Sequence, residues 1–142
     1  MNLYDQQRHE QQKRMNDFLD QYAFFAFNEK QFSDGIAKLG TETGSIVSIG
    51  GGGYVLKEKI FSLTDLMKRA QRERKEALED PETGSQFAYN MFYSELANHE
   101  YGYTGRADDA LDALGVSWED LAASPMLREA FEKARETILS EK

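Results

Sequence analysis

Residues 45–57 read SIVSIGGGGYVLK, which places two short apolar runs on either side of four glycines. Apolar, β-branched runs separated by glycines are typical of two strands joined by a tight turn, so this stretch predicts a β-hairpin. Phosphate-binding loops are also rich in glycine, but in them a helix follows the loop and its N-terminus meets the anion. Here a strand follows and no Gly-Lys-Ser/Thr occurs, so we favour the hairpin.

The segment before the hairpin predicts a third strand and a helix. AFFAF, residues 23–27, is short and rich in phenylalanine, as a buried strand would be. Asn28 is a suitable helix N-cap with Gln31 in the capping-box position, and Gly40 ends the helix. Gly35 inside this helix indicates close packing against another element. We therefore expect an α+β fold: a small three-stranded antiparallel or mixed sheet, one crossover helix, and later helices that cover the open face.

Helical patterns occupy the rest of the chain. We expect a first helix over residues 2–22, whose polar part DQQRHEQQKR projects into solvent or meets a partner. A later helix would begin at Ser62, with Asp65 as its capping-box partner and Phe61 packing as a hydrophobic staple. Residues 85–98 are apolar on most sides, which predicts the central helix of the core. Three more helices are expected over residues 107–114, 118–123 and from 125 onward. The prediction is one domain over 1–142, divided into an N-terminal helix (1–21), a strand-helix-hairpin (22–60) and a helical part (61–142).

Composition limits the chemistry and the compartment. The chain has 142 residues and no cysteine, which excludes disulfides, thiolate metal sites and thiol catalysis. Its N-terminal residues are polar, unlike a signal peptide, and no apolar run approaches the ~18 residues of a membrane span. We therefore expect a cytoplasmic protein with no membrane association and no cofactor.

The charge is strongly asymmetric. Residues 1–75 carry a net charge of +2 and residues 76–142 carry −10, within a total of −8. Ordinary solubility explains such a charge, and so does a dedicated face for a basic protein partner. Direct nucleic-acid binding by the acidic half is disfavoured because phosphates would be repelled. The predicted partner-binding residues are Asp108, Asp109, Asp112, Trp118, Glu119 and Asp120, with Trp118 as an aromatic anchor.

The segment SELANHE, residues 94–100, is the other candidate site. Glu95 and His99 are one helical turn apart, and Glu100 follows directly. A metal needs three or four ligands, and no HExxH and no second nearby histidine accompany these residues. The simpler interpretation is structural: an imidazolium near a helix C-terminus suits the helix dipole, and Glu95 pairs with it. The alternative is a small metal- or ligand-binding protein, or an enzyme, centred on Glu95, His99 and Glu100.

One dense basic patch offers a local anion contact at Lys68, Arg69, Arg72 and Lys75. The simpler interpretation of this patch is a solvent-exposed helix face, whose charges are neutralised by glutamates at one-turn spacing. No aromatic residues are interleaved for base stacking, so nucleic-acid contact here is the weaker hypothesis.

Three segments carry a resemblance to a known family: FFAFNEKQF, IGGGGYV and YSELANHEYGYTGRADDALDALG, all within residues 22–115. They resemble an uncharacterised family of small proteins carried by bacterial phages and mobile elements. The resemblance implies an accessory role, of the kind in which inhibitors of host defence are found. It implies no catalytic residues.

The predicted function is therefore a non-enzymatic accessory protein that binds a macromolecular partner through its acidic face, and inhibits a host nucleic-acid-handling or defence protein. A homo-oligomer built through the first helix is a further hypothesis. It rests on the polar part of that helix having no obvious intramolecular role.

Overall fold

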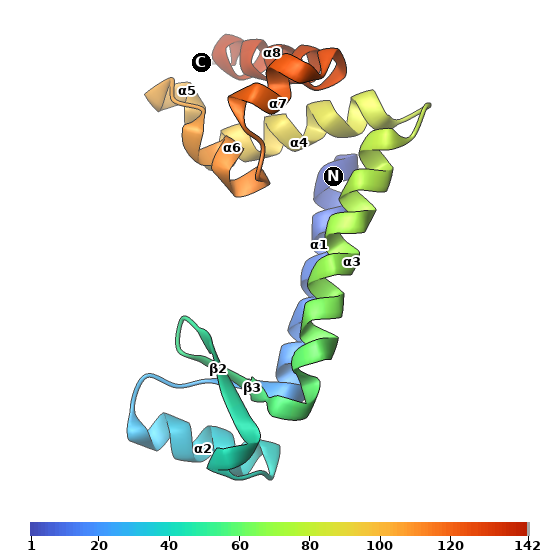
Figure 1. The fold of residues 1–142 in the computed structure, drawn as a ribbon. Coiled ribbons are helices and arrows are strands. Elements are labelled where there is room, and N and C mark those ends of the chain that lie inside the picture. Colours follow the sequence, from blue (N-terminus) through green and yellow to red (C-terminus); the bar gives the residue numbers. More distant parts are fainter. Residues whose placement is uncertain (142) are drawn as a thin grey trace. The chain divides into compact units, whose positions relative to one another are not determined.

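The computed structural model describes residues 1–141 and confirms an α+β fold. Figure 1 labels the α-helices and the strands β2 and β3, and we number all the elements, β1 included, in the same series. Their bounds are α1 Leu3–Tyr22, β1 Ala23–Phe25, α2 Glu29–Leu39, β2 Ile46–Gly50, β3 Gly53–Leu56, α3 Ile60–Glu79, α4 Gly84–Asn98, α5 Tyr101–Thr104, α6 Asp108–Leu114, α7 Trp118–Ala123 and α8 Pro125–Ser140. The chain divides into two compact units. We call Glu10–Arg72 the sheet unit, and Met1–His9 with Glu73–Lys142 the helical unit.

The sheet of the sheet unit has the strand order β1-β3-β2 and is antiparallel throughout. The predicted hairpin is confirmed, because β2 and β3 pair across the glycines. Gly50, Gly51 and Gly52 all have positive φ angles, of 86°, 58° and 80°, which side chains other than glycine rarely adopt. The tight turn therefore explains why this stretch is built of glycine.

The first strand is shorter and more exposed than the sequence predicts. β1 ends at Phe25, and the side chains of Phe25 and Phe27 are 54% and 76% exposed. The expectation of a buried strand over residues 23–27 is therefore wrong for its phenylalanines at 25 and 27. The reason is that α2 covers only one face of the sheet in this unit, so alternate side chains of β1 face outward.

The packing of α2 on the sheet confirms the predicted role of Gly35. A Cβ atom at Gly35 would overlap the ring of Phe24, so only glycine lets the helix approach this closely. Phe32 of α2 lies edge-on to the rings of Phe24 and Tyr54, with centroids 5.7 and 5.2 Å away. The helix begins as predicted: the Asn28 side chain accepts a hydrogen bond from the Gln31 backbone N–H.

The beginning of α3 differs from the prediction. The helix starts at Ile60 rather than Ser62, directly after a 3₁₀ turn over Lys57–Lys59. The Ile60 N–H donates to the Lys57 carbonyl, so a donor at the beginning of the helix is already satisfied without a side-chain cap. Phe61 is 81% exposed and does not form the expected staple.

The polar part of α1 has partners within each unit. In the sheet unit, the Gln11 side-chain amide donates to the Ala70 carbonyl of α3 at 3.2 Å. In the helical unit, the Gln7 amide donates to the Glu73 carbonyl at 3.1 Å. The expectation that this segment only projects into solvent or meets another protein is wrong at these positions. Polar side chains pack here because helix carbonyls accept further hydrogen bonds.

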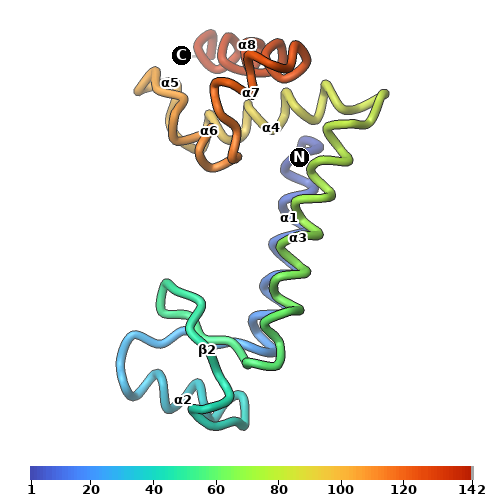
Figure 2. Tube along the Cα trace, viewed as in Figure 1, coloured from blue at the N-terminus to red at the C-terminus, as the bar shows by residue number. Residues whose placement is uncertain are grey.

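The core of the helical unit is built around α4, as predicted. Its buried apolar residues are Phe87, Ala88, Met91, Phe92 and Leu96. The ring of Phe92 lies edge-on to Phe131 of α8 at 5.5 Å, and Figure 2 shows α4 and α8 running beside each other. No helix over residues 1–141 has the length and apolar character that a membrane crossing requires.

Candidate functional site

The predicted acidic face lies on α6 and α7 of the helical unit. Both helices are short and turn their apolar residues inward: Leu111, Leu114 and Leu121 are buried. The acidic residues therefore face outward, and all of the predicted ones are exposed. Asp108 and Asp109 begin α6, where negative charge complements the partial positive charge of the helix N-terminus.

Trp118 holds a defined position on this face. Its indole Nε1–H donates to Asp108 Oδ1 at 3.2 Å, which joins α7 to α6. Its ring is edge-on to Phe131 of α8, with centroids 5.7 Å apart and an interplanar angle of 89°. Even so, 55% of the side chain is exposed. These two contacts hold the exposed aromatic surface in one orientation, and a surface held in this way would lose less entropy if it bound a partner.

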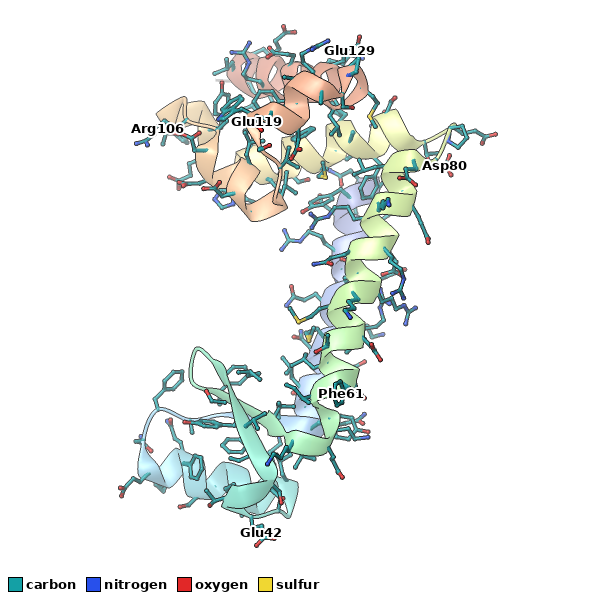
Figure 3. The ribbon with its side chains drawn as sticks, in the orientation of Figure 1. Glu42, Phe61, Asp80, Arg106, Glu119 and Glu129 are labelled. Atoms are coloured by element: carbon teal, nitrogen blue, oxygen red, sulfur yellow. The ribbon has the colours of Figure 1, made fainter. Side chains whose placement is uncertain are left out.

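The other acidic residues divide into two groups. Asp120 caps its own helix, because its carboxylate accepts a hydrogen bond from the Ser117 backbone N–H in the capping box of α7. Among the described residues, no basic group lies within 4.0 Å of the carboxylates of Asp109, Asp112 or Glu119. Figure 3 labels Glu119 on α7. These charges are available to an external cation.

The second candidate site, Glu95, is the centre of a buried polar cluster. Glu95 is only 5% exposed, although it carries a carboxylate. Its Oε1 accepts hydrogen bonds from Arg8 at 2.7 Å and from the Tyr4 hydroxyl at 3.2 Å. Its Oε2 lies 3.5 Å from Nε2 of His99, as the one-turn spacing predicts. A buried carboxylate needs such partners, because an unpaired buried charge is strongly unfavourable.

The start of α1 adds further polar contacts along α4. The Leu3 N–H donates to Asn90 Oδ1 at 3.1 Å, and the Asn2 amide donates to Ser94 Oγ at 3.0 Å. Buried Asn90 and Ser94 are therefore both satisfied. The polar row on α4 acts as a docking surface for the first residues of the chain.

Tyr4 remains a neutral donor in this cluster. Burial and, next, the nearby Glu95 carboxylate together raise the pKa of its hydroxyl to about 12, while Arg74 and Arg8 partly oppose the effect. Its ring also lies edge-on to Phe87 at 5.8 Å. Tyr4 and Arg8 were not predicted from the sequence, because they are 91 and 87 residues from Glu95. The one available signal was a glutamate on a helix that is apolar on most sides.

Glu100 stands apart from the Glu95 and His99 pair. It is exposed and has a positive φ of 58°, which interrupts the helix after His99. Across residues 1–141, no three or more His, Cys, Asp or Glu side chains gather in a group that could hold a metal ion. The structure thus joins two of the three predicted ligands through one contact.

The basic residues Lys68, Arg69, Arg72 and Lys75 are placed on α3, where Lys68, Arg69 and Arg72 belong to the sheet unit and Lys75 to the helical unit. Arg69 already interacts within the chain. Arg74, which was not in the predicted set, donates instead to the Leu114 carbonyl at 3.0 Å. An anion contact at this helix stays a prediction.

These features define an α+β protein with a small antiparallel sheet, a helical core around α4, and an exposed acidic face. The chain belongs to the family of unknown function DUF7659, which it matches over residues 3–137. No curated protein and no solved structure gives a significant match.

Proposed function

We propose that this protein is a non-enzymatic binding protein whose acidic face docks onto a basic macromolecular surface. The face consists of Asp108, Asp109, Asp112 and Glu119 around Trp118. The observation that carries the proposal is the fixed, half-exposed indole of Trp118. Tryptophan is among the residues that dominate binding energies at protein interfaces, and its face also attracts cations such as the arginine guanidinium.

The charge distribution supports a basic partner. By residue count, the helical unit carries a net charge of −9 and the sheet unit +1. A field of this sign attracts a basic surface, speeds the encounter at low salt, and repels nucleic acid. Complementary charge also predicts that binding weakens as salt rises.

We further propose that the protein serves a phage or mobile element as an accessory protein, and that it inhibits a host protein that handles nucleic acid or acts in defence. The support is the sequence resemblance together with the acidic face. A groove that normally holds phosphates is lined by arginine and lysine, and an acidic surface can occupy it by the same electrostatic attraction. The partner would then lose access to its nucleic acid.

A capture experiment tests the acidic face. Tagged protein is incubated with a bacterial lysate, washed at low and moderate salt, and read by mass spectrometry. We expect a stoichiometric basic protein that is lost at the higher salt. The variant with Asp108, Asp109 and Asp112 all changed to Asn should lose this partner.

The matched control carries the same change of charge elsewhere on the helical unit. Glu79, Glu129 and Glu136 lie outside the acidic face, so the triple change of these residues to Gln should retain the partner. Equal loss in both variants would show that only total charge matters. Equal retention in both would remove the acidic face from the interaction.

The Glu95 and His99 contact supports a second candidate function, a metal- or small-ligand-binding protein centred on this pair. The specific observation is the buried carboxylate within 3.5 Å of an imidazole nitrogen. Metal analysis of purified protein tests it, with Zn²⁺ added back after chelation. Bound metal that is lost in His99→Ala would support it, and no bound metal would contradict a metal site.

A further inference from the structure

The outer edge of β1 presents a backbone donor and acceptor at Phe25. In an antiparallel pair, alternate residues direct both backbone groups toward the neighbouring strand. The Ala26 N–H donates to the Gly52 carbonyl at 2.9 Å, so the backbone groups of Ala26 point toward β3. Phe24 lies two residues earlier, opposite Tyr54, so its backbone N–H and C=O must point toward β3 as well. The N–H and C=O of Phe25 therefore point outward, away from the sheet.

Side chains of α2 support this orientation on both sides of Phe25. Lys38 Nζ donates to the Ala23 carbonyl at 3.3 Å, and Gln31 Oε1 accepts the Phe27 N–H at 2.7 Å. Both are long, flexible side chains. They form hydrogen bonds with backbone groups on this edge, where no neighbouring strand is present to do so. Between them, the backbone groups of Phe25 have no partner on the outer side among the described residues.

A groove of about 590 Å³ runs beside this edge, wholly within the sheet unit. The residues that line it include Asp20, Phe24, Phe25, Phe27, Asp34 and Lys38. Side chains alternate along a strand, so Phe24 lies on the face that α2 covers and Phe25 on the opposite face. An added strand would thus meet α2 on one face and exposed aromatic surface on the other.

We propose that this edge binds an extended peptide segment of a partner protein, which adds to the sheet as a fourth strand beside β1. Strand addition supplies backbone hydrogen bonds, and side-chain contacts on alternate positions supply specificity. The lining carries two carboxylates, Asp20 and Asp34, against one ammonium, Lys38. The segment should therefore alternate basic side chains, placed toward Asp34, with apolar side chains that cover Phe25 and Phe27.

A second copy of the chain fits this groove less well. Pairing β1 with itself about a twofold axis at Phe25 would set the groove carboxylates of one copy against those of the other. The edge of β1 belongs to the sheet unit and is independent of the acidic face on the helical unit. Either one can fail as a binding site without the other.

The test is a titration of ¹⁵N-labelled protein with a short synthetic peptide that alternates valine and lysine, followed by two-dimensional NMR. We expect the largest amide shifts at Phe25 and its neighbours in β1 and α2. A peptide with glutamate in place of lysine should bind at least about fivefold more weakly, because it would face Asp34 with like charge. No shift at about millimolar peptide would overturn the proposal.

Two substitutions sharpen the test. Phe25→Pro removes the outward N–H together with the phenyl ring and keeps the bonds to β3, so the sheet should survive while peptide binding falls at least about fivefold. Asp34→Asn should also weaken binding. Glu42→Gln, a change at an exposed carboxylate of the same unit outside the groove lining (Figure 3), should leave binding unchanged.

A change in the peptide keeps the test valid if Phe25→Pro does not fold. Methylation of the backbone nitrogens on one edge of the peptide removes its donors but keeps its side chains and charge. Binding by the unmethylated peptide alone supports strand addition. Equal binding by both peptides, or by wild type and folded Phe25→Pro, overturns it. Chemical shifts of β1 that change with protein concentration and not with peptide would assign the edge to a second copy and also overturn it.

Discussion

The sheet unit and the helical unit differ in how completely they bury their large apolar side chains. In the helical unit, α4 is surrounded by other helices, and Phe92, Met91 and Leu96 are almost fully buried. The sheet unit has three short strands and one helix against them, and it leaves Phe25, Phe27 and Phe61 more than half exposed. A three-stranded sheet needs packing on its apolar surfaces to be stable. The comparison teaches that the large aromatic and aliphatic side chains of α4 are buried in the helical unit, while three phenylalanines of the sheet unit stay exposed.

The two units also differ in net charge. The helical unit holds nearly all of the net negative charge, whereas the sheet unit is close to neutral by residue count. One unit is therefore suited to long-range electrostatic attraction, and the other to short-range contact with an extended segment. The following predictions test whether this division is real.

The largest expected effect lies in the core of the helical unit. Phe92→Ala removes a ring that is 1% exposed and lies against Phe131, and should lower the free energy of unfolding by about 3–5 kcal/mol. Phe61→Ala, at 81% exposure in the sheet unit, should change it by no more than about 0.5 kcal/mol. Urea denaturation followed by circular dichroism measures both. Similar losses would show that burial does not distinguish the two units.

Removing the buried carboxylate should have the next largest effect. Glu95→Ala leaves the Tyr4 hydroxyl without its acceptor and Arg8 without its ion pair, and should cost about 2–4 kcal/mol. Glu95→Gln keeps an acceptor oxygen for Tyr4 and should cost less. The readout is again urea denaturation. A Glu95→Ala variant as stable as wild type would show that the cluster contributes nothing to the helical unit.

A substitution in the sheet unit should have an intermediate effect. Gly35→Ala places a methyl group into the ring of Phe24, and the overlap should destabilise this unit by about 1–3 kcal/mol. Gly44→Ala is the control, because nothing lies within 4 Å of its Cβ position. NMR signals of Tyr54 report on the sheet unit directly. Unchanged signals in Gly35→Ala would contradict the close approach of α2.

The smallest expected effect is a pH dependence. The pKa of Tyr4 is raised to about 12 in the folded protein, above its ordinary value of 10.0. Its contribution to stability is therefore fully present below pH 10 and is lost as the pH rises toward 12, because the unfolded chain releases the proton first. Denaturation at pH 8, 10 and 11 should show a decline of about 1 kcal/mol that Tyr4→Phe makes shallower. An identical decline in both proteins would assign it to other tyrosines.

Much of the fold could be predicted because its signals are local. The glycines between β2 and β3 and the Asn28 cap each act within about four residues, and both are confirmed. The Ser62 cap failed, because the preceding 3₁₀ turn already supplies a carbonyl to the first N–H of α3. The backbone N–H groups at the start of a helix bond to whichever acceptor lies nearest, and the sequence alone does not show which acceptor that is.

In the candidate sites, too, the contacts between residues close in the chain could be predicted, and the contacts between distant residues could not. The spacing of Glu95 and His99 predicted their contact, since one helical turn separates them. No spacing predicted Tyr4 and Arg8, which reach Glu95 from the other end of the chain. Trp118 was predicted as an anchor, but its bond to Asp108 and its contact with Phe131 depend on how α6, α7 and α8 pack.

By itself, the sequence determined most of the helices, the hairpin, the asymmetry of charge and the places where glycine is required, because these depend on backbone sterics and on neighbours in the chain. Only the tertiary structure decided which groups satisfy the buried Glu95 and which backbone atoms of Phe25 remain unpaired. Those outcomes depend on burial and strand pairing, which bring together residues that have no relation along the chain.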